Sequence, residues 1–285
     1  MARLPEVGGD DGNWGHILND FLRTAHADDG TLAPNTVSGS TLQAESVTEA
    51  HLSTAVQAKL NATPEPVTEQ AVPIDRQAGL VGWWQFEEQS GMIAVDASGF
   101  GNHGRMPASA TRTAGRIGQA VQLAGSGSGI MTSSMLFNIT RNATIALWVR
   151  PSASGTQALI KKSANAQTDG YELTISSSGR PFFRCQQFSS GDTYRIDAPS
   201  SIPTNGSSWS HVAVTIADDS TVRLYVNGAQ VATGAAPATG LPMNDLPLII
   251  GAETSGDYAL TGGVDDVRFY DTVLTPIEVA ALYAA

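Results

Sequence analysis

Several features that would narrow the function are scarce or missing in this 285-residue sequence. It has one cysteine, Cys185, so a disulfide within the chain is excluded and a half-buried structural thiol is expected. No apolar run approaches the roughly 20 residues of a membrane span, and the first residues lack the apolar stretch of a secretory signal. We therefore expect no membrane insertion, and folding in a cytoplasm without a signal peptide.

Positive charge is also scarce. The chain has 16 Lys and Arg against 27 Asp and Glu, and its only adjacent basic residues are Lys161 and Lys162. Nucleic-acid binding needs clustered cations that contact phosphates, so we expect no nucleic-acid partner.

The common catalytic motifs are missing as well. The sequence has no GxSxG elbow, no HExxH zinc helix and no phosphate loop, and its five histidines are scattered without metal spacing. Glycoside hydrolysis needs two carboxylates about 5 to 10 Å apart. The adjacent pairs Glu87–Glu88 and Asp265–Asp266 are expected to point to opposite faces of their strands, so we expect a protein that is not an enzyme.

The first 79 residues predict an attachment device. In residues 1–30, an apolar face recurs at helical spacing after an acidic start, which predicts a helix that docks on a larger particle or, alternatively, on its own domain. That docking face comprises Trp14, Ile17, Leu18, Phe21 and Leu22. Residues 31–60 carry a capping box, Ser46 to Glu49, and a narrow stripe of Leu52, Val56 and Leu60. They predict a trimerising shaft segment or a solvated spacer helix, and residues 61–79, with three prolines, predict a linker.

From Leu80 the apolar residues alternate with period two, which indicates strands. Clear examples are Ala143–Pro151, Gly170–Ile175, Trp209–Ile216 and Val222–Val226, and Asn227-Gly228 is a strong hairpin signal. Thr275-Pro276-Ile277-Glu278 has the pattern of a capped helix start. Residues 80–285 are therefore predicted to be mainly β, a sandwich or jelly roll with one late helix.

Seven short motifs carry a family resemblance over residues 80–283. They are WQFE at 84–87, DASGFGNHG at 96–104, GQAVQL at 118–123, IALWV at 145–149, WSHVAV at 209–214, LYVNG at 224–228 and VDDVRFY at 264–270. In this order they resemble laminin-G-like, concanavalin A-like jelly rolls. The resemblance implies the fold. It does not imply one function, because lectins, glucanase domains and adhesion modules all share this fold.

The N-terminal part resembles the anchors and shafts of phage tail fibres and contractile-injection fibres. The matching residues are LPEVGGDDGNWG at 4–15 and SVTEAHL at 46–52. The resemblance implies a homotrimer, with the anchor bound to a tail or baseplate protein and the jelly roll at the tip.

The glycine-rich loop at residues 96–104 is a candidate calcium site. Asp96 and Asn102 supply oxygen atoms of the type that Ca²⁺ prefers. The laminin-G-like resemblance implies that Asp265 lies near this loop and completes the ligand set. The alternative is that Asp96 and Asn102 only fix the turn by hydrogen bonding to backbone groups.

Exposed aromatic residues beside polar groups are candidates for sugar contacts. They are Phe100 and His103 in the glycine-rich loop, Tyr194 near Asp192, and Tyr258 in another expected loop. Together, these features predict a tail fibre or receptor-binding protein of a phage or phage-like contractile particle. It would be assembled in the bacterial cytoplasm and would bind a cell-surface glycan through residues 80–285. The alternative is a stand-alone carbohydrate-binding or adhesion module of a bacterial surface protein.

Overall fold

The computed structural model describes residues 16, 78–127, 129–139, 142–164, 170–186, 193–235, 243–253 and 255–285. The docking face predicted for residues 1–30, the shaft predicted for residues 31–60 and nearly all of the predicted linker lie outside the described residues. The chain divides into two compact units between Val72 and Pro73, and the architecture below is that of the C-terminal unit.

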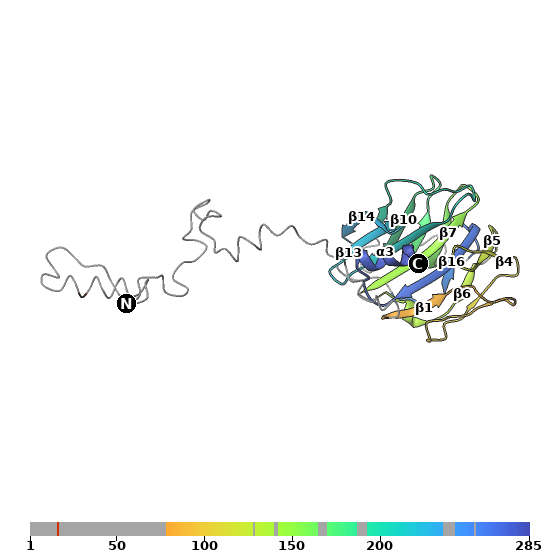
Figure 1. Ribbon diagram of the computed structural model, residues 1–285, viewed down its shortest axis with the longest axis horizontal. Coiled ribbons are helices and arrows are strands. Elements are labelled where there is room, and N and C mark those ends of the chain that lie inside the picture. Colours follow the sequence, from red (N-terminus) through yellow and green to blue (C-terminus); the bar gives the residue numbers. More distant parts are fainter. Residues whose placement is uncertain are drawn as a thin grey trace, which may run out of the picture. The chain divides into compact units, whose positions relative to one another are not determined.

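Two antiparallel sheets of eight strands each form a sandwich (Figure 1), so the predicted jelly-roll class is confirmed. We call the first the helix-side sheet; its order is β14 (Ala229–Ala235), β13 (Thr221–Val226), β12 (Ser210–Ile216), β7 (Ala143–Pro151), β16 (Thr261–Tyr270), β5 (Gln119–Ala124) and β4 (Thr111–Ala114), with β1 (Leu80–Trp84) also paired to β16. We call the second the open-side sheet; its order is β11 (Thr193–Asp197), β10 (Pro181–Gln186), β9 (Tyr171–Ile175), β8 (Gln157–Lys162), β15 (Leu248–Ile250), β6 (Ile130–Thr132), β3 (Gly104–Arg105) and β2 (Ile93–Ala94).

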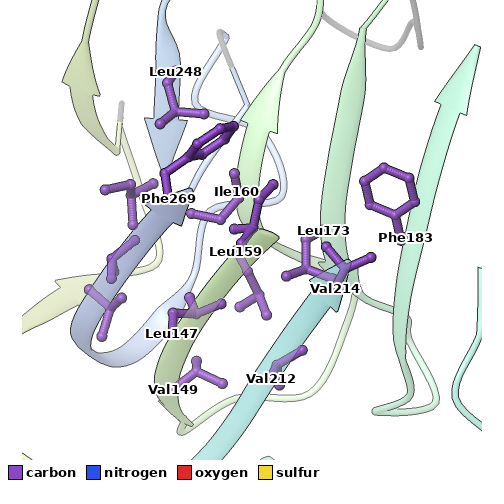
Figure 2. Close-up of a cluster of buried hydrophobic side chains, with 14 of the residues drawn as sticks. Leu147, Val149, Leu159, Ile160, Leu173, Phe183, Val212, Val214, Leu248 and Phe269 are labelled. Carbon is purple, nitrogen blue, oxygen red and sulfur yellow. The ribbon is translucent and has the colours of Figure 1, made fainter. Parts of the chain in front are cut away.

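The core lies between the two sheets. Apart from the bulges in β8 and β16, alternate residues of the strands point inward, as the period-two pattern predicts. Figure 2 shows Leu147, Val149 and Val214 from the helix-side sheet facing Leu173 and Phe183 from the open-side sheet. Each such side chain is nearly or fully buried, which stabilises the fold by about 1.5–3 kcal/mol per residue.

Two local predictions are confirmed. Asn227 and Gly228 join β13 to β14 with φ values of 51° and 77°, the left-handed conformations that this two-residue turn requires. The helix α3 (Pro276–Ala284) begins with the expected capping box, in which the Thr275 hydroxyl accepts the N–H of Glu278 and the Glu278 carboxylate accepts the N–H of Thr275. A 3-10 turn, η3 (Met135–Phe137), follows β6.

The two outer faces of the sandwich differ. On the helix-side sheet, Val279 and Leu282 of α3 pack against small and aromatic residues such as Ala146, Ala213 and Tyr225. Among the described segments, no helix covers the outer face of the open-side sheet, and none has the length and hydropathy of a bilayer span. A ligand can therefore reach the open-side sheet without displacing a helix of the described segments.

Candidate functional site

The loop formed by residues 96–104 is organised around the Asp96 carboxylate. Its Oδ1 atom accepts the backbone N–H groups of Trp83 (2.8 Å) and Ser98 (2.9 Å), and its Oδ2 atom accepts that of Asn102 (2.8 Å). The Nδ1 atom of His103 in turn accepts the N–H of Asp96 at 3.0 Å. The carboxylate thus holds the loop onto β1 through backbone groups, as an Asx residue does in a turn.

The structure brings Asp96 and Asn102 together but gives Asp265 partners in another loop. The Oδ2 atom of Asp265 accepts the N–H groups of Arg116 (2.7 Å) and Ile117 (2.9 Å). Calcium takes about six to eight oxygen ligands, and the described segments hold no group of three or more acidic, histidine or cysteine side chains suited to a metal. These contacts match the turn-fixing alternative, and calcium at this loop stays a prediction.

The prediction that Asp265 and Asp266 point to opposite faces is wrong. A β-bulge between Asp265 and Arg268 interrupts the alternation of β16, and Asp266 takes a φ of 46°. Asp265 lies opposite Trp148, and the Asp266 carboxylate accepts the Nε1–H of Trp83 (2.7 Å) and pairs with Arg268 (3.0 Å). Both carboxylates are buried on the face that α3 covers, and burial raises the pKa of Asp265 to about 7.

A second buried titratable group, His211, lies on the same face. Its ring packs against Trp148 and Tyr283, with centroid distances of 5.2 and 6.2 Å, and its Nδ1 atom has no hydrogen-bond partner among the residues that the structure describes. Burial, with a smaller contribution from the Arg268 guanidinium, lowers the pKa of His211 to about 3. His211 is therefore neutral at physiological pH.

On the open-side sheet, antiparallel pairing aligns polar residues from successive strands into rows. One row runs Lys161, Glu172, Arg184, Arg195, and the next runs Ala158, Thr174, Phe182, Asp197. Their neighbours in the strands, such as Leu173, Phe183 and Ile196, point into the core. The alternation of each strand therefore places charged side chains on the outer face.

A cleft of about 300 Å³ lies on these rows, a size at the lower end of ligand pockets. We call it the open-side cleft; it is lined by Thr156, Ala158, Glu172, Thr174, Ser176, Ser177, Phe182, Arg184, Arg195, Glu253 and Tyr258. Its lining combines charged groups, hydroxyls and aromatic rings, the types of group that bind sugars by hydrogen bonds and ring contact.

The floor of the cleft is a buried ion network. The Lys161 ammonium, whose side chain is fully buried, donates to Glu172 (3.1 Å) and to Glu253. The other oxygen of Glu172 pairs with Arg184 at 2.7 Å. The Glu172 and Glu253 side chains are only 3% and 4% exposed, so water cannot replace the Lys161 ammonium as their partner. The ion network therefore keeps its position.

The wall of the cleft is an arginine stacked on an aromatic ring. The Arg195 guanidinium carbon lies 3.7 Å from the centroid of Phe182, and that of Arg184 lies at 6.0 Å. Arg195 also makes a bidentate pair with Asp197, at 2.8 and 2.5 Å. Hydrogen bonding to this guanidinium lowers the pKa of Asp197.

Within the described part of the chain, two polar atoms of the cleft are buried without a partner. They are the hydroxyl oxygen of Thr174 and the Nε atom of Arg184. Buried polar groups in native structures nearly always have partners, so an unpartnered pair in a cleft indicates where a ligand can bind.

The predicted ligand residues lie in different places. Tyr258 lines the cleft and is 53% exposed. Phe100 and His103 are exposed in the loop at residues 96–104 and are not among the residues that line it. Tyr194 lies within β11 rather than in a loop, and packs against the core because strand alternation turns it away from Arg195. A sugar contact by any of these four residues stays a prediction.

The sequence-based prediction missed the charged rows. Glu172, Arg184 and Arg195 are each flanked on both sides by apolar residues, as in Tyr171-Glu172-Leu173. A lone charge between two inward-facing residues of a strand marks the outer face. That signal was present in three strands, but only the register shows that the three charges lie side by side.

A protein-family comparison extends this description. The family model described as the concanavalin A-like lectin/glucanases superfamily matches residues 124–280. This segment contains every residue that lines the open-side cleft.

Solved structures with the same fold are distant in sequence. The binding domain of Paraclostridial Mosquitocidal Protein 1 is 19% identical, with a TM-score of 0.60, over 72% of this chain and 52% of that domain. Domain 4 of AbnA, a GH43 extracellular arabinanase from Geobacillus stearothermophilus in complex with arabinotriose, is 21% identical, with a TM-score of 0.58, over 72% of this chain and 98% of that domain. The binding domain of Botulinum Neurotoxin DC in complex with SialylT is 15% identical, with a TM-score of 0.58, over 73% of this chain and 52% of that domain. The chain thus spans about half the length of the toxin binding domains that it matches.

Proposed function

Because this chain belongs to the concanavalin A-like lectin/glucanase superfamily, we propose that its open-side cleft binds a glycan. The observation that carries the proposal is that the Thr174 hydroxyl and the Arg184 Nε atom, both from residues that line a cleft of the right size, are buried without a partner among the described residues. A sugar offers dense hydroxyl groups that can satisfy both atoms. Tyr258, exposed at the edge, offers a ring face to the apolar side of the sugar.

The structural neighbours support this proposal. The AbnA domain was solved with arabinotriose and the neurotoxin domain with SialylT, and both share the fold of this chain. The adjacent acids of β16, Asp265 and Asp266, are buried and bound to protein groups, so they are poorly placed to act on a substrate. We therefore propose a binding function without catalysis.

Replacing Thr174 with valine tests the glycan role. Thr174→Val keeps the shape of a strand residue and removes a hydroxyl that has no protein partner, so we expect stability to be unchanged and glycan affinity to fall about 5- to 15-fold. The measurement is calorimetric titration of the full chain with the best ligand from an array of bacterial surface glycans.

A matched control exists on the other sheet. Thr215 in β12 also has a buried hydroxyl without a partner, but it lies on the helix-side sheet. Thr215→Val should leave glycan affinity at the parent value. Equal affinities for the parent and Thr174→Val would contradict the location of the site, and an array without any bound glycan would contradict the glycan role.

We further propose that the chain is the receptor-binding fibre of a phage or phage-like contractile particle. The supporting observation is the resemblance of residues 4–15 and 46–52 to fibre anchors and shafts. The particle would bind a bacterial cell surface through several linked clefts, whose combined avidity exceeds the affinity of one. The alternative is a stand-alone carbohydrate-binding or adhesion module of a bacterial surface protein.

Solution mass separates these two proposals. We expect the full chain to have the mass of a trimer by light scattering, and residues 73–285, which form a compact unit with their own core, to have the mass of a monomer. That result would locate assembly in residues 1–72. A monomeric full chain would contradict the fibre and favour the stand-alone module.

A further inference from the structure

The open-side cleft has balanced charge. Among the described residues that line it, Glu172 and Glu253 oppose Arg184 and Arg195. The two charged groups bonded to them from outside the lining, Lys161 and Asp197, also have opposite signs. Three cations thus face three carboxylates, and the charges of the lining residues and their bonded partners cancel.

The negative charges in the floor cannot move away from an incoming acid. Glu172 and Glu253 are held by Lys161, and their side chains are 3% and 4% exposed. A ligand carboxylate that approached Arg184 would meet Glu172, whose oxygen lies 2.7 Å from that guanidinium. Like charges in a poorly solvated site repel strongly, so Arg184 is not a free anion site.

Arg195 is committed to protein groups as well. One face of its guanidinium stacks on Phe182 at 3.7 Å, and two of its nitrogen atoms bind both oxygens of Asp197. An acidic ligand group that bound Arg195 would have to displace the Asp197 carboxylate or lie next to it. Displacement of an exposed pair is inexpensive, but the Asp197 charge stays close to the ligand because Asp197 lies in the same strand.

The groups left for a ligand are suited to hydroxyls. The Thr174 hydroxyl can donate and accept, whereas the Nε–H of Arg184 donates. Resting on the glycan role proposed above, we infer that the open-side cleft selects uncharged sugars and discriminates against sugars that carry a carboxylate or sulfate group.

Matched pairs of sugars test this selectivity. The full chain is titrated with lactose and 3′-sialyllactose, with galactotriose and trigalacturonic acid, and with galactose and galactose 6-sulfate. We expect the neutral member to bind at least 5-fold tighter in each pair that binds. Its affinity should change less than 2-fold between 50 and 500 mM NaCl, because salt screens charge–charge interactions and an uncharged sugar makes few of them.

A charge variant tests the cause. Asp197→Asn leaves Arg195 without its carboxylate partner, so the preference for the neutral member should shrink about 5-fold or reverse. Asp218→Asn is the matched control, since Asp218 is an exposed acid in the turn between β12 and β13 of the other sheet, and it should leave the preference unchanged.

Failure of the proposed selectivity and failure of the proposed glycan role give different results in these titrations. Tighter binding of the acidic member by the parent chain overturns the selectivity while the glycan role stands. An unchanged preference in Asp197→Asn overturns charge balance as its cause. Absence of binding both to the three pairs and to every glycan of the array overturns the glycan role itself, and the selectivity with it.

Discussion

Lys161→Met is expected to lower the free energy of unfolding by about 3–5 kcal/mol. The change leaves Glu172 and Glu253 buried without the ammonium that both of them bind. Arg184 still pairs with Glu172, so the Glu172 carboxylate keeps one of its two ion pairs. Urea unfolding of the full chain, followed by tryptophan fluorescence, measures the effect.

The control restores charge neutrality in the floor of the cleft. Lys161→Met combined with Glu253→Gln leaves the Glu172–Arg184 pair in place, so cations and carboxylates balance again, and should recover more than half of the lost stability. Arg180→Met, at an exposed position outside the cleft, should change the free energy of unfolding by less than about 0.5 kcal/mol. A single Lys161→Met variant as stable as the parent would show that the network contributes nothing to the fold.

Opposite pH dependences are expected for Asp265→Asn and His211→Leu. His211 has a folded pKa of about 3 against an ordinary value of 6.5, so the unfolded state binds the extra proton and stability falls as pH drops from about 6.5 to 3. Asp265 has a folded pKa of about 7 against an ordinary value of 3.8, so the folded state binds the extra proton and stability rises as pH drops from about 7 to 4. Each slope reaches about 1.4 kcal/mol per pH unit, and in the parent the two oppose each other between about pH 4 and 6.5.

Each variant removes one of the two opposing pH dependences of the unfolding free energy. Asp265→Asn keeps an oxygen for the N–H groups of Arg116 and Ile117 and places an amide where Oδ1 has no partner. Relative to the parent, it should lose stability as pH falls from 7 to 4, whereas His211→Leu should gain it. The measurement is urea unfolding at half-unit pH steps from 4 to 8. The difference in unfolding free energy between variant and parent is compared across pH. If it changes with pH in the same direction for both variants, the assignment of these pKa values is contradicted.

The fold was accessible from sequence because its signals are local. Alternation predicted β7 over the range that it occupies, Ala143–Pro151, and the Asn227-Gly228 turn was correctly predicted as a hairpin. The order of the strands could not be predicted from local signals, because β16 pairs with β5 and β7, which lie more than 100 residues earlier in the chain. The bulge in β16 was missed because Asp266 takes a left-handed φ without being glycine, asparagine or part of a turn motif.

The site was only partly accessible for the same reason. Asp96 and Asn102 are close in sequence, and their association was predicted. The row of Lys161, Glu172 and Arg184 depends on the register of three strands, so its members gave no local motif. Their flanking apolar residues indicate an outer face in each strand separately, whereas the buried ion network is a property of the sheet as a whole.

The stacking of Arg195 on Phe182 limits how tightly one cleft can hold a sugar. In the free protein the ring already has an occupant that is tethered to the neighbouring strand, and such an occupant competes at high effective concentration. A ligand that contacts the Phe182 ring must first displace a guanidinium held by Asp197, so the apparent affinity of each cleft for such a ligand is lowered. Under the fibre proposed above, attachment by single clefts would be readily reversible, and a particle bearing several copies would move across a surface by exchanging one contact for another.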